Sequence, residues 1–191
     1  MAPADEDATF LVLNGAHLKK MATADDIAGA VGVPSEVAQQ ELASAVEKGW
    51  AISVGGRYLV VPAGTAVVHE FYAKLYAPLR GDAAIEAWYG RFDALNDQFI
   101  KAVSDWQKDE EDEKAKTKIL KAVERLVKAL RDIVPTIPRF ANYIHRFTEG
   151  VGRVDRGDRN YVCGPSIDSV HTVWFEFHED ILSVLGRPRD V

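Results

Sequence analysis

Apolar residues recur at helical spacing through the first quarter of the chain and then change to strict alternation. The spacing predicts three helices, over residues 8–21, 24–31 and 35–48. Trp50, Ile52 and Val54 then alternate with smaller residues, Gly55-Gly56 follows, and an apolar run returns over residues 58–61, which is typical of a β-hairpin with a two-residue turn. Three helices followed by a hairpin is the order of a winged helix-turn-helix, so we expect this module at the N-terminus.

Helical spacing resumes after the hairpin and continues almost to the end. Further helices are predicted over residues 65–76, 82–107, 119–133, 140–147 and 166–185. The charged run 108–118 is predicted as a solvated loop or frayed helix end, and the segment 150–165, rich in Gly, Asp and Arg, as a loop. We therefore predict a mainly α fold with a winged-helix domain over residues 1–78 and a helical bundle domain over residues 79–191.

Composition narrows the class of protein. The chain has 191 residues, of which 47% are hydrophobic and 27% charged, as in ordinary globular domains. No apolar run is long enough to cross a bilayer and the first residues do not form a secretory leader, so we expect a cytoplasmic protein with no membrane partner. Cys163 is the one cysteine, which excludes a Cys-based zinc site, and we expect no metal or cofactor bound by this chain.

Charge argues against a strong DNA-binding surface on the expected winged helix. Residues 1–80 carry six Lys and Arg against nine Asp and Glu, a net charge of 6 − 9 = −3. Three carboxylates on the third predicted helix, Glu36, Glu41 and Glu47, would oppose DNA phosphates, whose neutralisation supplies most non-specific affinity. DNA is therefore the weaker partner hypothesis, and its candidate contacts are Ser35, Gln39, Gln40, Lys48 and Arg57.

The last predicted helix combines two stripes of side chains. One stripe is apolar and includes Val173, Trp174 and Phe177, and a second stripe beside it contains two histidines, His171 and His178. The histidines are seven residues apart, about 10 Å along a helix, so they cannot chelate one metal ion as an i, i+4 pair does. Two interpretations stay open: proton transfer or ligand binding, and hydrogen-bonded histidines at the edge of the core.

Other polar residues interrupt apolar stripes and raise the same choice between a ligand pocket and a structural network. Buried polar groups need partners, and the polar residues that could supply them to one another are Asn96, Asp105, Arg139, Asp168 and His171. The candidate ligand-binding or interface residues are Asn96, Asp105, Trp106, Gln107, Arg139, Asp168, His171, Trp174, His178 and Glu179. No catalytic residue is assigned, because the sequence contains no phosphate-binding loop, Ser-His-Asp set or HExxH motif.

The segments 95–96, 104–107, 139–140 and, above all, 168–182 resemble the tail region of actinobacterial pyruvate phosphate dikinase and PEP synthase-like phosphotransferases. The resemblance covers nearly the whole chain and implies an accessory or regulatory subunit with no complete active site. The ATP-grasp region and the Gly-rich motif around the phosphorylated histidine are missing here, so it implies a larger dikinase-like catalytic subunit that binds ATP and Mg²⁺. Some relatives in this group phosphorylate phenolic ketones such as hydroxyacetophenones, which implies an aromatic acceptor near Trp106, His171 and Trp174.

Two other classes of protein fit the same pattern. A stand-alone transcriptional regulator resembling MarR or PadR proteins would dimerise through the long helices after the wing and bind a small aromatic effector at the polar set. A structural interaction module would bind protein alone. The sequence leaves these alternatives open, because fold does not by itself determine function.

Overall fold

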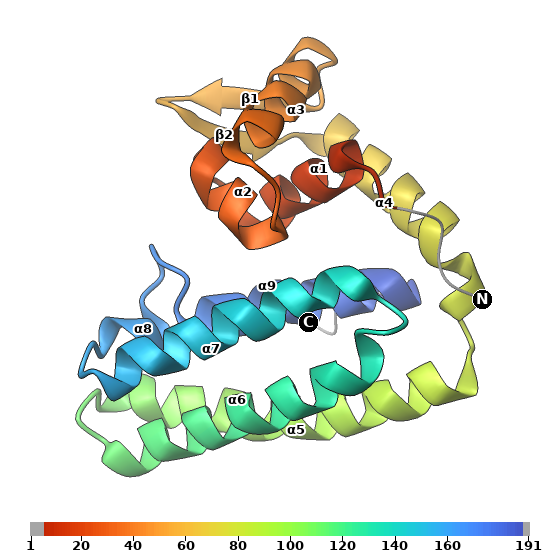
Figure 1. The fold of residues 1–191 in the computed structure, drawn as a ribbon. Helices are drawn as coiled ribbons and strands as arrows, with labels where there is room; N and C mark the ends of the chain where they lie inside the picture. The colour runs from red at the N-terminus through yellow and green to blue at the C-terminus, as the bar shows by residue number, and fades with distance from the viewer. Residues whose placement is uncertain (1–5, 189–191) are drawn as a thin grey trace. The chain divides into compact units, whose positions relative to one another are not determined.

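A computed structural model describes residues 6–188 of the chain (Figure 1). The described part is mainly helical, with a single two-stranded antiparallel sheet, which confirms the predicted fold class at that level. It divides into two compact units, one made of Met1–Arg80 with His178–Val191 and the other of Gly81–Phe177. No helix in the described part is both long enough and apolar enough to cross a membrane.

The first unit begins with three helices and a hairpin. Its elements are α1 (Ala8–Lys19), α2 (Ala24–Val31), α3 (Ser35–Glu47), β1 (Ala51–Val54), β2 (Arg57–Val60), α4 (Pro62–Tyr76) and the 3₁₀ turn η1 (Ala77–Leu79). The strands pair from Ala51 opposite Val60 to Val54 opposite Arg57. Gly55 and Gly56 both have positive φ, at 57° and 76°, as the tight turn between the strands requires.

Alternation in the hairpin separates a buried from an exposed face. Tyr58 and Val60 pack against the buried cluster of α1, α2 and α3, which includes Val12, Ile27 and Leu42. The side chains of neighbouring residues in a strand point the opposite way, so Leu59 and its partner Ile52 lie on the other face. The core therefore fixes which residues the hairpin presents outward.

A glycine allows α4 to start close to the hairpin. A Cβ atom on Gly64 would lie 2.1 Å from the carbonyl oxygen of Trp50, well inside van der Waals contact. A backbone hydrogen bond maintains this close approach, because the amide of Val61 donates to the same carbonyl oxygen at 2.9 Å. Only glycine satisfies this geometry without displacing the chain.

The second unit is helical throughout its regular elements. They are α5 (Ala83–Lys108), α6 (Glu113–Ile133), the 3₁₀ turn η2 (Pro138–Phe140), α7 (Ala141–Asp155), α8 (Asn160–Cys163) and the first half of α9 (Val170–Leu185), whose second half belongs to the first unit. The long antiparallel pair of α5 and α6 is visible in Figure 1 in green. Trp88 on α5 links the two helices, because its indole nitrogen donates to the carbonyl of Ala129 on α6 at 2.8 Å.

Three predicted boundaries were wrong. The charged run 108–118, predicted as a solvated loop or frayed helix end, contains the end of α5 and the start of α6, whose first turn is capped by the Asp112 side chain accepting from the Lys114 and Ala115 amides. The segment 150–165 is not one loop, since α7 continues to Asp155 and α8 follows. The last helix starts at Val170 rather than near residue 166, where the Ser169 hydroxyl accepts from the Thr172 amide at 3.2 Å. Residue 168 therefore precedes α9.

Candidate functional site

Asn96 and Trp174, two of the predicted site residues, meet in the aromatic core of the second unit. Trp174 lies parallel to the ring of Phe99 with centroids 3.8 Å apart, and Phe92 packs nearby at 5.9 Å. The indole nitrogen of Trp174 donates to Oδ1 of Asn96 at 2.9 Å, and both side chains are buried. A buried indole N–H needs a hydrogen-bond acceptor, so Asn96 stabilises this core by accepting that hydrogen bond.

Asp168 is part of a buried ion cluster centred on Arg146. Nε of Arg146 donates to Oδ2 of Asp168 at 2.7 Å, and Nη2 lies 2.7 Å from Oε2 of Glu176. The second contact is an ion pair without hydrogen-bond alignment. Arg146 and Glu176 are only 6% and 3% exposed. Burial works against the guanidinium charge, but Glu176 and Asp168 outweigh it and hold the pKa of Arg146 above its usual range.

His171 lies at the margin of this core. It is half-buried, and its ring stacks on Phe99 with centroids 6.4 Å apart and planes 22° from parallel. Burial lowers the pKa of His171 below its ordinary value, so the imidazole is neutral at pH 7. A neutral, half-exposed imidazole can donate one hydrogen bond and accept another at the surface.

Four other predicted residues are not brought together. Asp105 lies 3.6 Å from Lys108 on the same helix, and Gln107 is exposed. Trp106 is buried with a guanidinium over its ring at 5.8 Å, and Arg139 stacks on the Phe140 ring at 4.9 Å. The last two predicted residues, His178 and Glu179, belong to the first unit. Within the described residues no group of three or more His, Cys, Asp or Glu side chains could hold a metal ion.

The ionic residues that are themselves buried, Arg146, Glu176 and Asp180, were not among the sequence candidates. Arg146 lies on the apolar side of α7 with Tyr143, Phe147 and Gly150, at spacings of three and four residues, so its position in the stripe was a usable signal. In the first unit Asp180 is fully buried, and the Tyr72 hydroxyl lies 2.7 Å from its Oδ1 and 2.9 Å from Oδ1 of Asn14. No local pattern marks Asp180, because its partners are far away in sequence.

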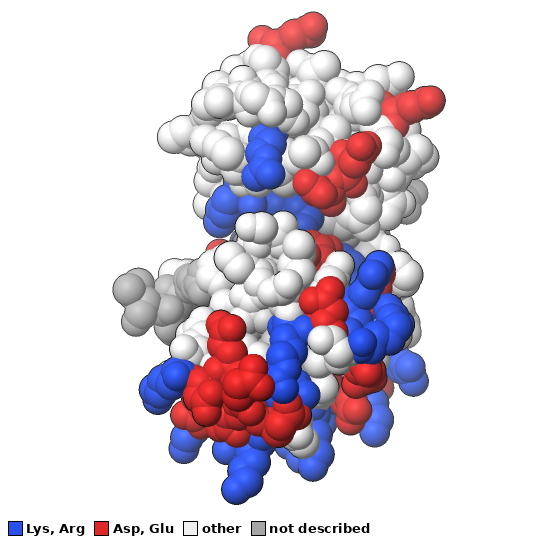
Figure 2. All heavy atoms as spheres, turned by 90° about the vertical axis from the view of Figure 1, so that its left-hand side faces the viewer, with Lys and Arg blue, Asp and Glu red and all other residues white. Residues whose placement is uncertain are grey.

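The outward face of the hairpin is apolar. Ile52 and Val54 are 44% and 55% exposed, and they share this face with Leu59 and Arg57. Arg57 is the only charged side chain in the two strands. Figure 2 shows that the exposed surface of the first unit in this view is mostly uncharged. Two neighbouring exposed apolar side chains make this face a candidate protein-binding surface.

The candidate DNA contacts all lie on the surface of the first unit. They are Ser35, Gln39, Gln40, Lys48 and Arg57. Lys48 already makes a cation–π contact within the chain, because its ammonium lies 4.7 Å from the centroid of the Trp50 ring. Two cations and three neutral polar side chains, next to exposed Glu36 and Glu47, give phosphates few partners.

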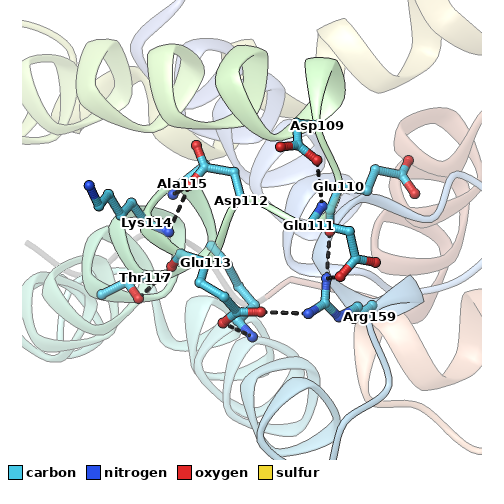
Figure 3. A network of polar contacts seen from close by, with 10 residues as sticks. Asp109, Glu110, Glu111, Asp112, Glu113, Lys114, Ala115, Thr117 and Arg159 are labelled. Atoms are coloured by element: carbon cyan, nitrogen blue, oxygen red, sulfur yellow. Dashed lines mark hydrogen bonds and ion pairs between the residues drawn. The ribbon is translucent and has the colours of Figure 1, made fainter.

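An acidic turn joins α5 to α6 in the second unit (Figure 3). Residues 109–113 are all Asp or Glu, and Arg159 contacts three of them. Its Nη1 donates to the Glu110 carbonyl at 2.7 Å and lies 2.9 Å from Oε2 of Glu111, while Nη2 contacts Oε1 of Glu113 at 2.5 Å. The turn is therefore fixed by contacts within the chain, and Figure 2 shows it as a dense acidic patch.

These surfaces differ in what they can do chemically. The ion cluster and the Asn96–Trp174 pair stabilise the core of the second unit, whereas the hairpin presents apolar side chains to solvent. Comparisons of the chain with protein-family models, with curated proteins and with solved structures gave no match.

Proposed function

We propose that this chain is a protein-interaction subunit that binds its partner through the hairpin. The observation that carries the proposal is the exposed apolar face of the hairpin, on which Ile52 and Val54 each expose about half of their side chains. Fully burying an exposed apolar side chain contributes roughly 1.5–3 kcal/mol, so burying these half-exposed ones at an interface contributes about half of that each. A lone cation, Arg57, lies beside them, so the surface offers apolar contact with one charged anchor.

The first unit is, in this proposal, a winged helix-turn-helix used for protein docking. Its support is the order of α1, α2, α3 and the hairpin, which is the order of such modules. DNA docking through α3 would set the exposed carboxylates of Glu36 and Glu47 against phosphates. The same helix face presents no such conflict to a protein partner.

The partner we propose is a dikinase-like catalytic subunit of a PEP synthase or pyruvate phosphate dikinase-related phosphotransferase. Support comes from the resemblance of residues 168–182 to the tail region of those enzymes. The partner would bind ATP and Mg²⁺ and transfer the phosphoryl group to a phenolic acceptor. In this chain Asp168, Trp174 and Glu176 of that segment hold the helical core, which leaves His171 at its margin as the candidate contact to partner or acceptor.

Reconstitution with such a catalytic subunit tests the proposal. The full chain alone should transfer no labelled phosphate from ATP to hydroxyacetophenone, whereas the mixture should. The Ile52→Lys, Val54→Lys double variant should weaken association by about tenfold or more, because two ammonium groups replace apolar contacts. The matched control is Ile100→Lys, since Ile100 is 56% exposed but lies on α5.

Two results would overturn the proposal. Phosphate transfer or stable self-phosphorylation by the chain alone would assign it an active site of its own. Sequence-specific binding to its own upstream DNA at near-physiological salt, with a Kd of about 10 nM or tighter, would favour a MarR- or PadR-like regulator. We expect only weak, salt-sensitive DNA binding.

A further inference from the structure

A line of cations runs along the exposed side of α6. The residues are Lys114, Lys118, Lys121, Arg125 and Lys128, all exposed. Their spacing of four, three, four and three residues places them within about 80° of one another around the helix and along about 21 Å of its axis. Neither Lys121 nor Lys128 forms an ion pair within the described residues, so the line retains free charge.

An apolar groove lies beside this line, between α6 and α7. Its volume is about 340 Å³, and its apolar lining consists of Val127 and Val151, which are partly exposed, and of Val123 and Phe147, which are buried. Lys128 and Arg131 border it from α6 together with one carboxylate, that of Glu124, and Thr148 borders it from α7. Lys128 thus belongs both to the groove and to the cationic line. The groove is at the small end of the range for ligand pockets, and it is open to solvent along the helices.

Carboxylates limit the length of the cationic line at both ends. The acidic turn of residues 109–113 directly precedes Lys114, and Asp132 follows Lys128 by about one turn of helix. A long polyanion that followed the line would meet like charge at each end, whereas an anionic segment of about 15 residues would not. A nucleic acid or a flat anionic membrane would also leave the apolar groove unfilled.

We propose that the groove between α6 and α7 binds an amphipathic helix of a partner protein that carries acidic residues beside its apolar stripe. Apolar side chains at i, i+3 or i+4 and i+7 of that helix enter the groove, which is the usual helix-in-groove mode. Carboxylates on the flank of the helix face Lys121, Lys128 and Arg131 and set its orientation. This inference is independent of the protein that binds the hairpin.

The probe is a display library of helical peptides about 15 residues long, with Leu fixed at the apolar positions and the flanking positions randomised. Selection against the full chain should enrich Asp and Glu on one flank. The Lys128→Glu, Arg131→Glu variant should then bind the selected peptides at least about tenfold more weakly. Thr148→Trp should abolish binding by filling the groove, because Thr148 is exposed and its hydroxyl bonds only to its own helix, at the Ile144 carbonyl.

The matched control reverses two cations elsewhere, as Lys74→Glu with Lys101→Glu, both exposed and outside the groove. It changes net charge by the same amount and should leave peptide affinity unchanged. Circular dichroism confirms that each variant is folded. The inference fails if enriched peptides show no acidic bias or bind the groove variants as tightly as the original chain. It also fails if duplex DNA or phosphatidylserine vesicles bind tightly and lose that binding in the Lys128→Glu, Arg131→Glu variant.

Discussion

Replacing Arg146 by methionine tests how the buried ion cluster stabilises the second unit. Methionine has a similar length and no charge, so packing is largely kept while the two carboxylates lose their common partner. Glu176 is 3% exposed and would be left as a buried charge, whereas the side chain of Asp168 is 38% exposed and stays hydrated. The cost should therefore arise mainly from Glu176.

Breaking a buried pair by removing one partner typically costs about 3–5 kcal/mol, because the remaining buried charge loses its counter-ion. With a urea dependence of about 2 kcal/mol per molar, that cost lowers the unfolding midpoint by about 1.5–2.5 M. Tryptophan fluorescence is a suitable probe, since Trp88, Trp106 and Trp174 all lie in this unit. We expect the free energy of unfolding of Arg146→Met to fall by this amount.

The double variant Arg146→Met, Glu176→Met distinguishes a stranded charge from lost packing. Replacing a buried ion pair by apolar residues of similar volume is often neutral, so the double variant should recover most of the lost stability. A single variant within about 1 kcal/mol of the original chain, or a double variant as unstable as the single one, would refute the reasoning.

Three further predictions concern stability. Burial, with the nearby charges of Lys20 and His69, lowers the pKa of His17 to about 4. The unfolded chain therefore binds more protons than the folded chain below pH 6.5, and the free energy of unfolding should fall between pH 6.5 and about 4. Thermal melts of His17→Gln should lose this part of the pH dependence. Trp174→Phe leaves a buried amide acceptor and should cost about 1–3 kcal/mol in urea unfolding. Gly64→Ala should lower the thermal midpoint by several degrees, since its Cβ overlaps a backbone carbonyl, whereas Gly90→Ala should not.

Local signals in the sequence predicted most of the elements. Helical spacing, the change to alternation and the Gly55-Gly56 turn predicted three helices and a hairpin in the order observed. These signals act between residues close in sequence, as do caps and turns. The start of α6 was missed because Lys114, Lys116 and Lys118 look like a solvated loop, although Ala115 and Ile119 are buried one turn apart.

The polar partners inside the core could not be predicted in the same way. The sequence predicted one polar network of Asn96, Asp105, Arg139, Asp168 and His171, but Asn96 pairs with Trp174 and Asp168 with Arg146. Such pairs span tens of residues, and nothing local specifies which partner a buried charge finds. Whether His171 contacts a ligand stays a prediction.

The contacts of α9 have a consequence for the order in which the chain folds during synthesis. The first unit is completed by Asp180, which bonds to Tyr72 across 108 residues, and by the Val184 carbonyl, which lies 3.4 Å from Nε of Arg80. These partners are synthesised after the second unit, which is one continuous segment from Gly81 to Phe177. The N-terminal unit can therefore be completed only after residues 180–184 have been synthesised, and a fragment ending at residue 80 would leave Tyr72 without its carboxylate.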